Sequence, residues 1–265
     1  MAIFKQACCL ASTLILALWA AVFLAPAGPA WAQGPHLRNA AVSLHSARAA
    51  IAPGETFTVV LRQEIRGGWH TYWRNPGDSG QATQIDWTMP VGFSAGPLRF
   101  PAPKRIPVDV LMNYGYAGEV LFPIEITAPR RLRPGRPVTL QAHASWLVCS
   151  DICIPEEEDV ALTLPVMAAG ADDPEWAPRV AAALAALPQP AQILGRVTPT
   201  EKGGLLTFVG APVRGARDVH FFPYAGDVID HAAPENPSRG ALGVALEVRP
   251  ARGRDLGALA FEGVL

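Results

Sequence analysis

Cysteine and charge are both scarce in this chain of 265 residues. It has 4 Cys, and only Cys149 and Cys153 lie beyond the first ten residues. A network of disulfides therefore does not hold the fold, and a chain of this length can bury a core without one. Charged residues make up 17% of the chain and the formal net charge is −1. The only basic tract is the short segment Arg130–Pro137. We therefore expect no nucleic-acid partner, since such partners need a basic surface.

Long hydrophobic runs are also absent, except near the amino terminus. An apolar run extends from Cys8 to Ala25, and Ala30 and Ala32 after it form the small-x-small pattern of a signal-peptidase site. We predict a signal peptide over residues 1–32 and a mature chain that begins near Gln33. An uncleaved anchor is the alternative, although a membrane span usually needs about 20 apolar residues. The mature protein is expected in an oxidising compartment such as the periplasm.

Alternating apolar and polar residues predict β-strands from Glu55 onward. The inward positions of three such strands are Phe57, Val59 and Leu61; Val120, Phe122, Ile124 and Ile126; and Val138, Leu140, Ala142, Ala144 and Trp146. Strands with one apolar face are typical of antiparallel sheets that pack face to face. The sequence therefore predicts an all-β sandwich. Trp69, Trp73, Trp87 and Trp146 are expected in its core, and Pro123 is expected on an edge strand.

One segment breaks the strand pattern and predicts a helix. Asp173 can cap it, Pro174 suits its first position and Pro188 ends it. Its apolar face consists of Trp176, Val180, Leu184 and Leu187. The amphipathic pattern is that of a connector between two β domains.

The predicted domains follow from this connector. We expect a first β domain over residues 33–170, a helical linker over 171–190, and a second β domain over 191–265, where short strands resume. The last strand ends on an apolar residue without a polar tail. This favours a truncated second domain, and an edge strand that ends at the terminus is the alternative.

The two remaining cysteines lie in the segment ASWLVCSDICIPEEED. A disulfide across so short a loop would stabilise the fold by only about 2 kcal/mol in the chain-entropy treatment. Exchange with the dithiol of a partner explains two adjacent thiols better, because it requires both to be always close. Strand periodicity places Cys149 at the end of a strand, and Pro155 is expected to end regular pairing after Cys153. Both sulfurs are thus predicted at a sheet rim, within reach of a partner.

Acidic residues lie close to the pair in the sequence, one between the two cysteines and four after them. The five are Asp151, Glu156, Glu157, Glu158 and Asp159. If they surround the cysteines, their negative charge raises the pKa of the thiols, and thiolate is scarce until a partner docks.

The sequence resembles a known family through three segments. These are GWHTYWRNPGDSG, MNYGYAGEVLFPIEI and WLVCSDICIPEEE. Together they resemble the amino-terminal periplasmic domain of the thiol:disulfide interchange protein DsbD, and most closely the DsbD-like proteins that include the copper-sensitivity suppressor ScsB. The resemblance covers about Leu37 to Val166. It implies an immunoglobulin-like β-sandwich, with roles in cytochrome c biogenesis or copper tolerance.

The resemblance also implies an activity and a site. Cys149 and Cys153 would be the redox pair, which takes electrons from a membrane-embedded domain, in cis or in trans, and passes them to thioredoxin-like periplasmic proteins. Tyr114 and Tyr116 would form a cap over the pair, and Tyr72 would line it. The activity would be thiol:disulfide interchange as part of a larger system, so whether this chain is an enzyme by itself stays open. No cofactor is implied.

Some features depart from the family pattern. The two cysteines of DsbD are further apart, and its cap carries acidic residues and Phe where this chain has Asn113 and Tyr. The membrane domain and the thioredoxin domain of the family are both missing here, so the chain is expected either to be a fragment, attached to the membrane through a missing carboxy-terminal region, or to use separate partners.

Two other functions are retained as alternatives. The first is a non-enzymatic binding module with a structural disulfide. The second is a Cu(I) carrier, since soft thiolates favour that ion, but His143 lies about 20 Å from Cys149 along an extended strand and cannot be a co-ligand. Met112 would need its loop to fold over, so no metal site is predicted. The tetrapeptide GDSG, which contains Ser79, is interpreted as a turn, because a serine protease needs a His and an Asp in partner motifs.

Overall fold

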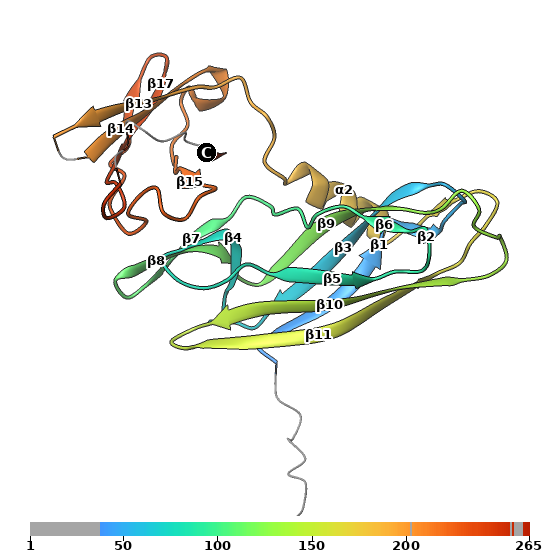
Figure 1. Cartoon of the computed structure of the whole chain (residues 1–265). Coiled ribbons are helices and arrows are strands. Elements are labelled where there is room, and N and C mark those ends of the chain that lie inside the picture. The colour runs from blue at the N-terminus through green and yellow to red at the C-terminus, as the bar shows by residue number, and fades with distance from the viewer. Residues whose placement is uncertain (1–37, 202, 255, 257–261) are drawn as a thin grey trace, which may run out of the picture. The chain divides into compact units, whose positions relative to one another are not determined.

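The computed structural model describes residues 38–201, 203–254, 256 and 262–265 (Figure 1). Residues Arg38–Leu265 form one compact unit. The predicted signal peptide lies outside the described residues and stays a prediction. Among the helices of the described part, none has the length and apolar character that crossing a membrane requires.

The first large sheet has the strand order β1-β3-β9-β6, and all its pairings are antiparallel. Its strands are β1 (Ala40–Ser46), β3 (Thr56–Ile65), β9 (Glu119–Thr127) and β6 (Ser94–Ala95). Phe57, Val59 and Leu61 are buried along β3 as the alternation predicted. The corresponding inward residues of β9 are buried as well.

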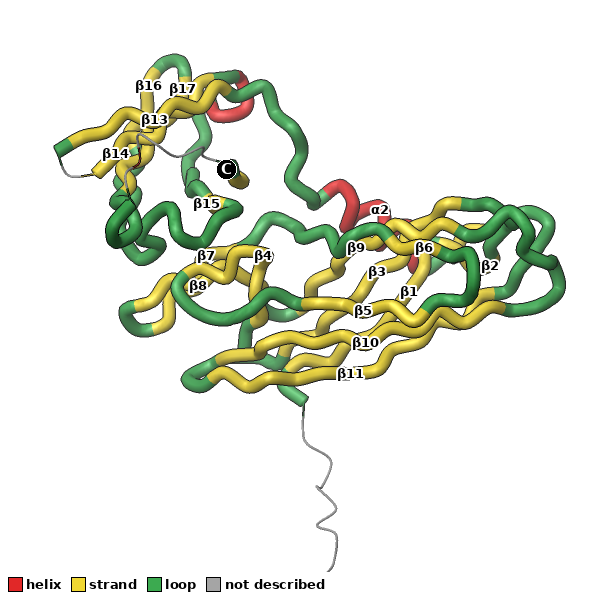
Figure 2. Tube along the Cα trace, in the orientation of Figure 1, coloured by secondary structure: helices red, strands yellow, loops and turns green. Residues whose placement is uncertain are grey.

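A second sheet, of order β11-β10-β5, packs against the first. Its strands are β5 (Gln84–Thr88), β10 (Val138–Cys149) and β11 (Cys153–Leu164), which Figure 2 shows running alongside one another. β10 and β11 form a long hairpin whose register runs from Val138 opposite Leu164 to Cys149 opposite Cys153. Residues of both sheets make up one hydrophobic core, which includes Trp73 and Trp146. Trp69 and Trp87 are half-buried and pack against it.

A third, smaller sheet extends the second at the hairpin tip. Its order is β4-β8-β7, with β4 (Thr71–Gly77), β7 (Lys104–Val108) and β8 (Leu111–Tyr116). His70, just before β4, forms an antiparallel bridge with Cys149, the last residue of β10. The predicted class, an all-β immunoglobulin-like sandwich of antiparallel sheets, is therefore confirmed.

Pro123 lies on β9, which is not an edge strand, so that prediction was wrong in its simple form. β6 pairs only with Ile126 and Thr127 of β9. Beside Pro123 the sheet has already ended, and the proline carbonyl accepts a hydrogen bond from the Arg99 amide at 3.0 Å. The missing N–H of Pro123 therefore faces a position with no strand, which is what a proline in a sheet requires.

Helix α2 (Trp176–Ala185) forms where the sequence predicted it. The Asp173 carboxylate accepts hydrogen bonds from the backbone amides of Glu175 and Trp176, at 2.9 and 2.8 Å, and so satisfies donors that have no partner within the helix. Trp176 and Val180 pack with Val60 on the outer face of the first sheet. A short pair of strands, β2 (Arg48–Ala50) and β12 (Ala171–Asp172), precedes the helix.

The carboxy-terminal part is also built of antiparallel strands. One sheet consists of β13 (Leu194–Thr200), β14 (Gly203–Val209), β17 (Gly243–Val248) and β16 (Ser238–Gly240). A second sheet consists of β15 (Phe222–Pro223) and β18 (Gly263–Val264). A short 3-10 helix, η2 (Ala211–Val213), follows β14. Leu206 and Leu246 are buried in a separate core. Phe222 and Val264, however, belong to the core of the sandwich. The division into domains 33–170, 171–190 and 191–265 stays a prediction.

Candidate active site around a disulfide

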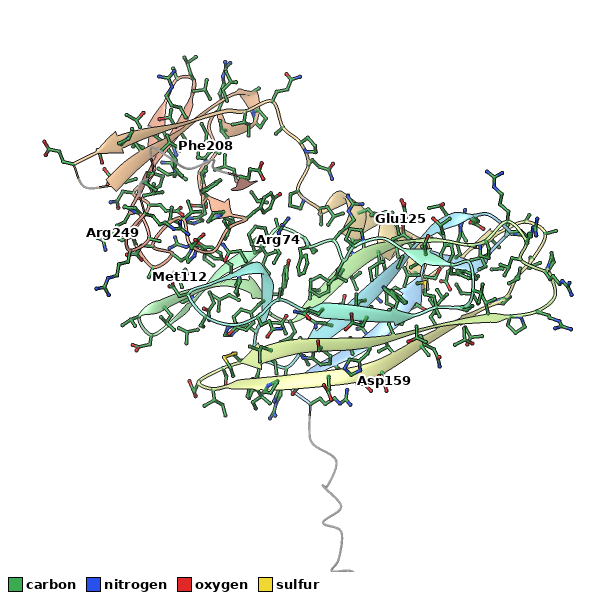
Figure 3. The ribbon with its side chains drawn as sticks, in the orientation of Figure 1. Arg74, Met112, Glu125, Asp159, Phe208 and Arg249 are labelled. Carbon is green, nitrogen blue, oxygen red and sulfur yellow. A yellow bond between two sulfur atoms is a disulfide. The ribbon has the colours of Figure 1, made fainter. Side chains whose placement is uncertain are left out.

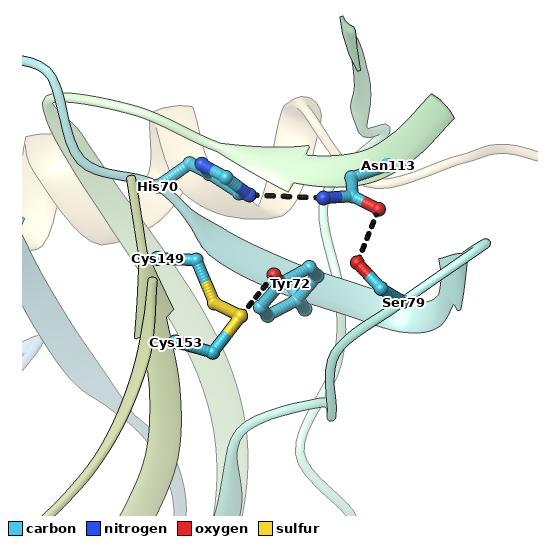
Figure 4. Close-up of a disulfide and its surroundings, with 6 residues drawn as sticks. All are labelled: His70, Tyr72, Ser79, Asn113, Cys149 and Cys153. Atoms are coloured by element: carbon cyan, nitrogen blue, oxygen red, sulfur yellow. Dashed lines mark hydrogen bonds between the residues drawn. A yellow bond between two sulfur atoms is a disulfide. The ribbon is translucent and has the colours of Figure 1, made fainter. Parts of the chain in front are cut away.

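Cys149 and Cys153 form a disulfide that crosses the tip of the β10–β11 hairpin (Figure 4). The amide and carbonyl of Cys149 both bond to His70, at 2.9 Å each, so they point away from β11. Cys149 and Cys153 are therefore a non-hydrogen-bonded cross-strand pair, the kind whose Cα atoms approach to about 4.5 Å. Their Cα atoms are 4.2 Å apart. The hairpin register thus brings the two sulfurs together without any further loop.

The two cysteines differ in exposure. Cys149 is 2% exposed, whereas Cys153 is an exposed residue and its neighbour Ile152, at the hairpin tip, is 66% exposed. We expected both sulfurs to be within reach, and this holds only for Cys153. Cys149 is covered because His70 continues the sheet beside it. A partner thiol can therefore reach only one end of the bond.

Tyr72 contacts the exposed cysteine. Its hydroxyl lies 3.4 Å from Cys153 Sγ. Burial raises the pKa of Tyr72, so the phenol stays protonated and its hydroxyl can donate a hydrogen bond to the sulfur. Gly80 covers the ring: its φ is +102°, and a Cβ at this position would overlap the Tyr72 side chain. The structure thus brings Tyr72 to the pair, where the family resemblance placed it, while its role there stays a prediction.

Tyr114 and Tyr116 are directed elsewhere. Both are buried, Tyr114 with its hydroxyl 3.0 Å from His231 Nδ1, and Tyr116 with its hydroxyl donating to the Pro101 carbonyl at 2.8 Å. Burial raises the pKa of both phenols. The hydrogen bonds found for them in the described part of the chain lead away from the sulfurs. A cap formed by these two tyrosines stays a prediction.

Asn113 faces the site in their place, because residues alternate between faces along β8. Ser79 Oγ donates to Asn113 Oδ1 at 2.9 Å, and Asn113 Nδ2 lies 3.2 Å from His70 Nε2 (Figure 4). Ser79, Asn113 and His70 thus form a chain of hydrogen bonds that ends beside Cys149. Ser79 lies in a turn, as predicted for GDSG, and its hydroxyl is bound by an amide and not by a base.

Sequence reasoning did not assign His70, Asn113 or Ser79 to the site. One signal was available: His70 and Tyr72 are two residues apart, and therefore share a face of an extended segment. The position of Asn113 was noted only as a departure from the family pattern. Its link to Ser79 depends on the Asp78 turn, which is fastened to Met112 by two hydrogen bonds and follows no sequence period.

The four acidic residues after the pair do not surround it, and only Asp151 lies at the hairpin tip, between the two cysteines. Pro155 was expected to end regular pairing, but β11 continues through it opposite Leu147. Because this is a non-hydrogen-bonded pair on an edge strand, the missing N–H of Pro155 points outward and costs no hydrogen bond. An extended strand places Glu156 about 10 Å and Asp159 about 20 Å from Cys153, and Figure 3 shows Asp159 far along the hairpin.

These acids also have partners of their own. Glu158 pairs with Arg38, and Asp159 lies 2.8 Å from His143 Nδ1. The hydrogen bond to Asp159 is the main cause that raises the pKa of His143. The four acids of β11 are therefore not placed around the thiols as expected, and an influence of Asp151 on their ionisation stays a prediction. Within the described residues, no group of three or more His, Cys, Asp or Glu is arranged to hold a metal ion.

A stability measurement can detect the buried imidazole. Burial lowers the pKa of His70 in the folded protein, whereas in the unfolded chain the group titrates near 6.5. The unfolded state therefore binds a proton first as the pH falls, and we expect stability to decrease from about pH 6.5 downward. His45, whose pKa burial also lowers, contributes in the same direction. The measurement is the free energy of unfolding in urea as a function of pH.

The control for this prediction is the His70→Gln variant. It should retain only the part of the pH dependence that His45 and the other groups supply, so its stability should fall less on acidification. Equal slopes in the two proteins below about pH 6.5 would contradict the prediction.

Two comparisons relate this chain to known proteins. Residues 39–165 match the family model described as thiol:disulfide interchange protein DsbD, N-terminal. The resemblance predicted from the sequence is thereby confirmed for that segment. The crystal structure of the N-terminal periplasmic domain of ScsB from Proteus mirabilis is similar in fold, with a TM-score of 0.56, 21% identity, and coverage of 83% of each chain. Coverage this large extends beyond residues 39–165. No curated protein sequence matches the chain.

Proposed function

We propose that the DsbD N-terminal domain of this chain relays reducing equivalents in the periplasm by thiol–disulfide exchange through Cys149 and Cys153. Its electron donor would be a membrane-embedded electron-transfer domain, in cis or in trans, and its clients would be thioredoxin-like proteins. One observation carries the proposal: a disulfide at a hairpin tip joins one exposed and one buried cysteine. Membership in the family supports it.

The chemistry balances as two successive displacements. A thiolate of the donor attacks Cys153 Sγ, a bond forms between these sulfurs, and the S–S bond breaks with its electron pair on Cys149, which takes up a proton. The second thiol of the donor loses its proton and attacks the donor sulfur of the mixed disulfide, and Cys153 leaves as a thiolate that takes a proton from solvent. The donor dithiol is then oxidised to a disulfide and the pair is reduced to two thiols. The same steps in the opposite direction reduce an oxidised client.

The hairpin allows the bond to open without loss of the fold. Every residue of β10 from Val138 to Cys149 pairs with a residue of β11, and Cys149 is also tied to His70. The disulfide closes only a short loop at the end of this ladder, so its loss costs about 2 kcal/mol in the chain-entropy treatment. A redox-active pair needs such independence from the fold.

The test compares two reductants. The folded, oxidised protein is treated with a reduced thioredoxin-like protein or with glutathione at equal thiol concentration, and free thiols are counted over time. We expect the protein donor to be at least about tenfold faster, because it can dock over the exposed sulfur. Circular dichroism should be the same before and after reduction.

A disulfide that resists both reductants until the protein unfolds would overturn the proposal and favour a binding module with a structural disulfide. Equal rates with the two reductants would also count against a docked exchange. The His143→Gln variant is the matched control, because His143 lies far along the same hairpin, and it should react at the wild-type rate.

A further inference from the structure

The chain of hydrogen bonds beside Cys149 has a definite direction. Ser79 Oγ donates to Asn113 Oδ1, which places the amide nitrogen of Asn113 against His70 Nε2. An amide nitrogen can only donate, so Nε2 must accept and carries no proton. The imidazole is then neutral, with its proton on Nδ1. Asn113 therefore selects both the charge and the tautomer of His70.

The surroundings of His70 oppose a positive charge. The residue is 4% exposed and Asn113 is 2% exposed. The titratable neighbours of His70 are Tyr72, whose ring centre lies 5.1 Å from that of His70, and Cys149 across the antiparallel bridge. Desolvation is the cause that lowers the pKa of His70. A second proton on this ring would set Nε2–H against the N–H of Asn113 in a buried place where no carboxylate of the described residues pairs with it, which is costly.

The neutral ring matters because of what happens at Cys149. His70 and Cys149 exchange two backbone hydrogen bonds, so their side chains are direct cross-strand neighbours on one face. When the disulfide is opened at Cys153, the electron pair goes to this buried sulfur. An imidazolium beside it would stabilise a thiolate, as in cysteines activated by histidine. A neutral imidazole gives no such stabilisation.

We propose that Asn113 is a positioning residue that holds His70 neutral beside Cys149, so that the leaving sulfur is released as a thiol and the pair stays strongly reducing. The proton on Cys149 is the one that the donor's second thiol gives up, so the exchange remains balanced. This inference deepens the proposed function and rests on it for its biological meaning. A reductant benefits from this arrangement, because stabilising the thiolate would favour the reduced form and weaken electron transfer to clients.

The test is the Asn113→Asp variant, which has nearly the same shape. Its carboxylate can accept from both Ser79 and a protonated Nε2, so His70 becomes an imidazolium. We expect the equilibrium with a dithiothreitol redox buffer to shift at least about tenfold toward the reduced protein, which corresponds to about 30 mV. The pKa of the Cys149 thiol, followed by alkylation rate against pH, should fall.

The control places the same substitution in a protein with His70→Gln. A carboxylate without the imidazole disfavours a nearby thiolate, so the double variant should be unchanged or shift toward the oxidised form relative to His70→Gln alone. A shift toward the reduced protein that appears only when His70 is present distinguishes an effect through His70 from a direct effect of charge or a general loosening of the fold. An Asn113→Asp variant with an unchanged or more reducing pair would overturn the inference.

A measurement on the unaltered chain covers the case in which the variants do not fold. Nitrogen NMR of the imidazole at about pH 7 should find the proton of His70 on Nδ1 in both redox states. A proton on Nε2 would overturn the inference. The redox-buffer and NMR measurements use no protein partner. They therefore test this inference even if the chain never exchanges with a thioredoxin-like protein, a result that would contradict only the proposed function.

Discussion

A Cys149→Ala variant should accumulate a mixed disulfide with an oxidised thioredoxin-like partner, while a Cys153→Ala variant should form about tenfold less or none. The reason is access: Cys153 is exposed at the hairpin tip, and Cys149 is 2% exposed behind His70. In Cys149→Ala the thiol of this chain that could resolve the adduct is also gone, so only the second thiol of the partner can release it, and rapid alkylation of that thiol preserves the adduct. Non-reducing gels and mass spectrometry of the adduct provide the measurement.

The control for trapping is a partner that lacks its reactive cysteine, which should give no adduct with either variant. Thermal unfolding should be similar for the two variants, since both lose the same short disulfide. Stable adducts formed only by Cys153→Ala would contradict the assignment of Cys153 as the sulfur attacked first.

The Phe122→Ala variant should be destabilised by about 3–5 kcal/mol, the usual cost of removing a buried aromatic ring. Phe122 is 0% exposed and lies edge-on to Phe100 and Tyr116, with ring centres 5.4 Å apart in each case. Its loss would leave a cavity between the two sheets. Urea unfolding of the oxidised protein measures the change.

Val91 provides the matched control for this substitution, because its side chain is 100% exposed. The Val91→Ala variant should change the free energy of unfolding by less than about 0.5 kcal/mol. A loss below about 1 kcal/mol for Phe122→Ala would mean that the sandwich core is not organised around this ring.

The parts of the fold that were predictable follow a short period in the sequence. Phe57, Val59 and Leu61 alternate with polar residues, and burial of one face follows directly from that. The helix could be predicted equally well, since Asp173 and Pro188 mark its ends. The pairing of Cys149 with Cys153 could be predicted from the position of Cys149 at a strand end, the short separation of the two cysteines and the family resemblance.

The features that were missed depend on contacts between distant segments. Asn113 reaches His70 only because β8 pairs with β4, and no local pattern encodes that register. Burial of Cys149 has the same origin, since its cover comes from a strand nearly eighty residues earlier in the chain. The prediction that Pro155 ends strand pairing was wrong for another reason. A proline ends pairing only where its missing N–H faces a partner strand, and the missing N–H of Pro155 faces the open edge of β11.

The carboxylate of Glu156 closes a seam between the two sheets. It accepts the backbone amides of Asn39 and Ala40, at 2.9 and 3.1 Å, and so occupies the place that a carbonyl of a neighbouring strand would take. The edges of β1 and β11 are thereby engaged with each other at this point. The flank of the sandwich is thus protected against unwanted strand addition and the aggregation that follows from it, while the hairpin tip stays uncovered.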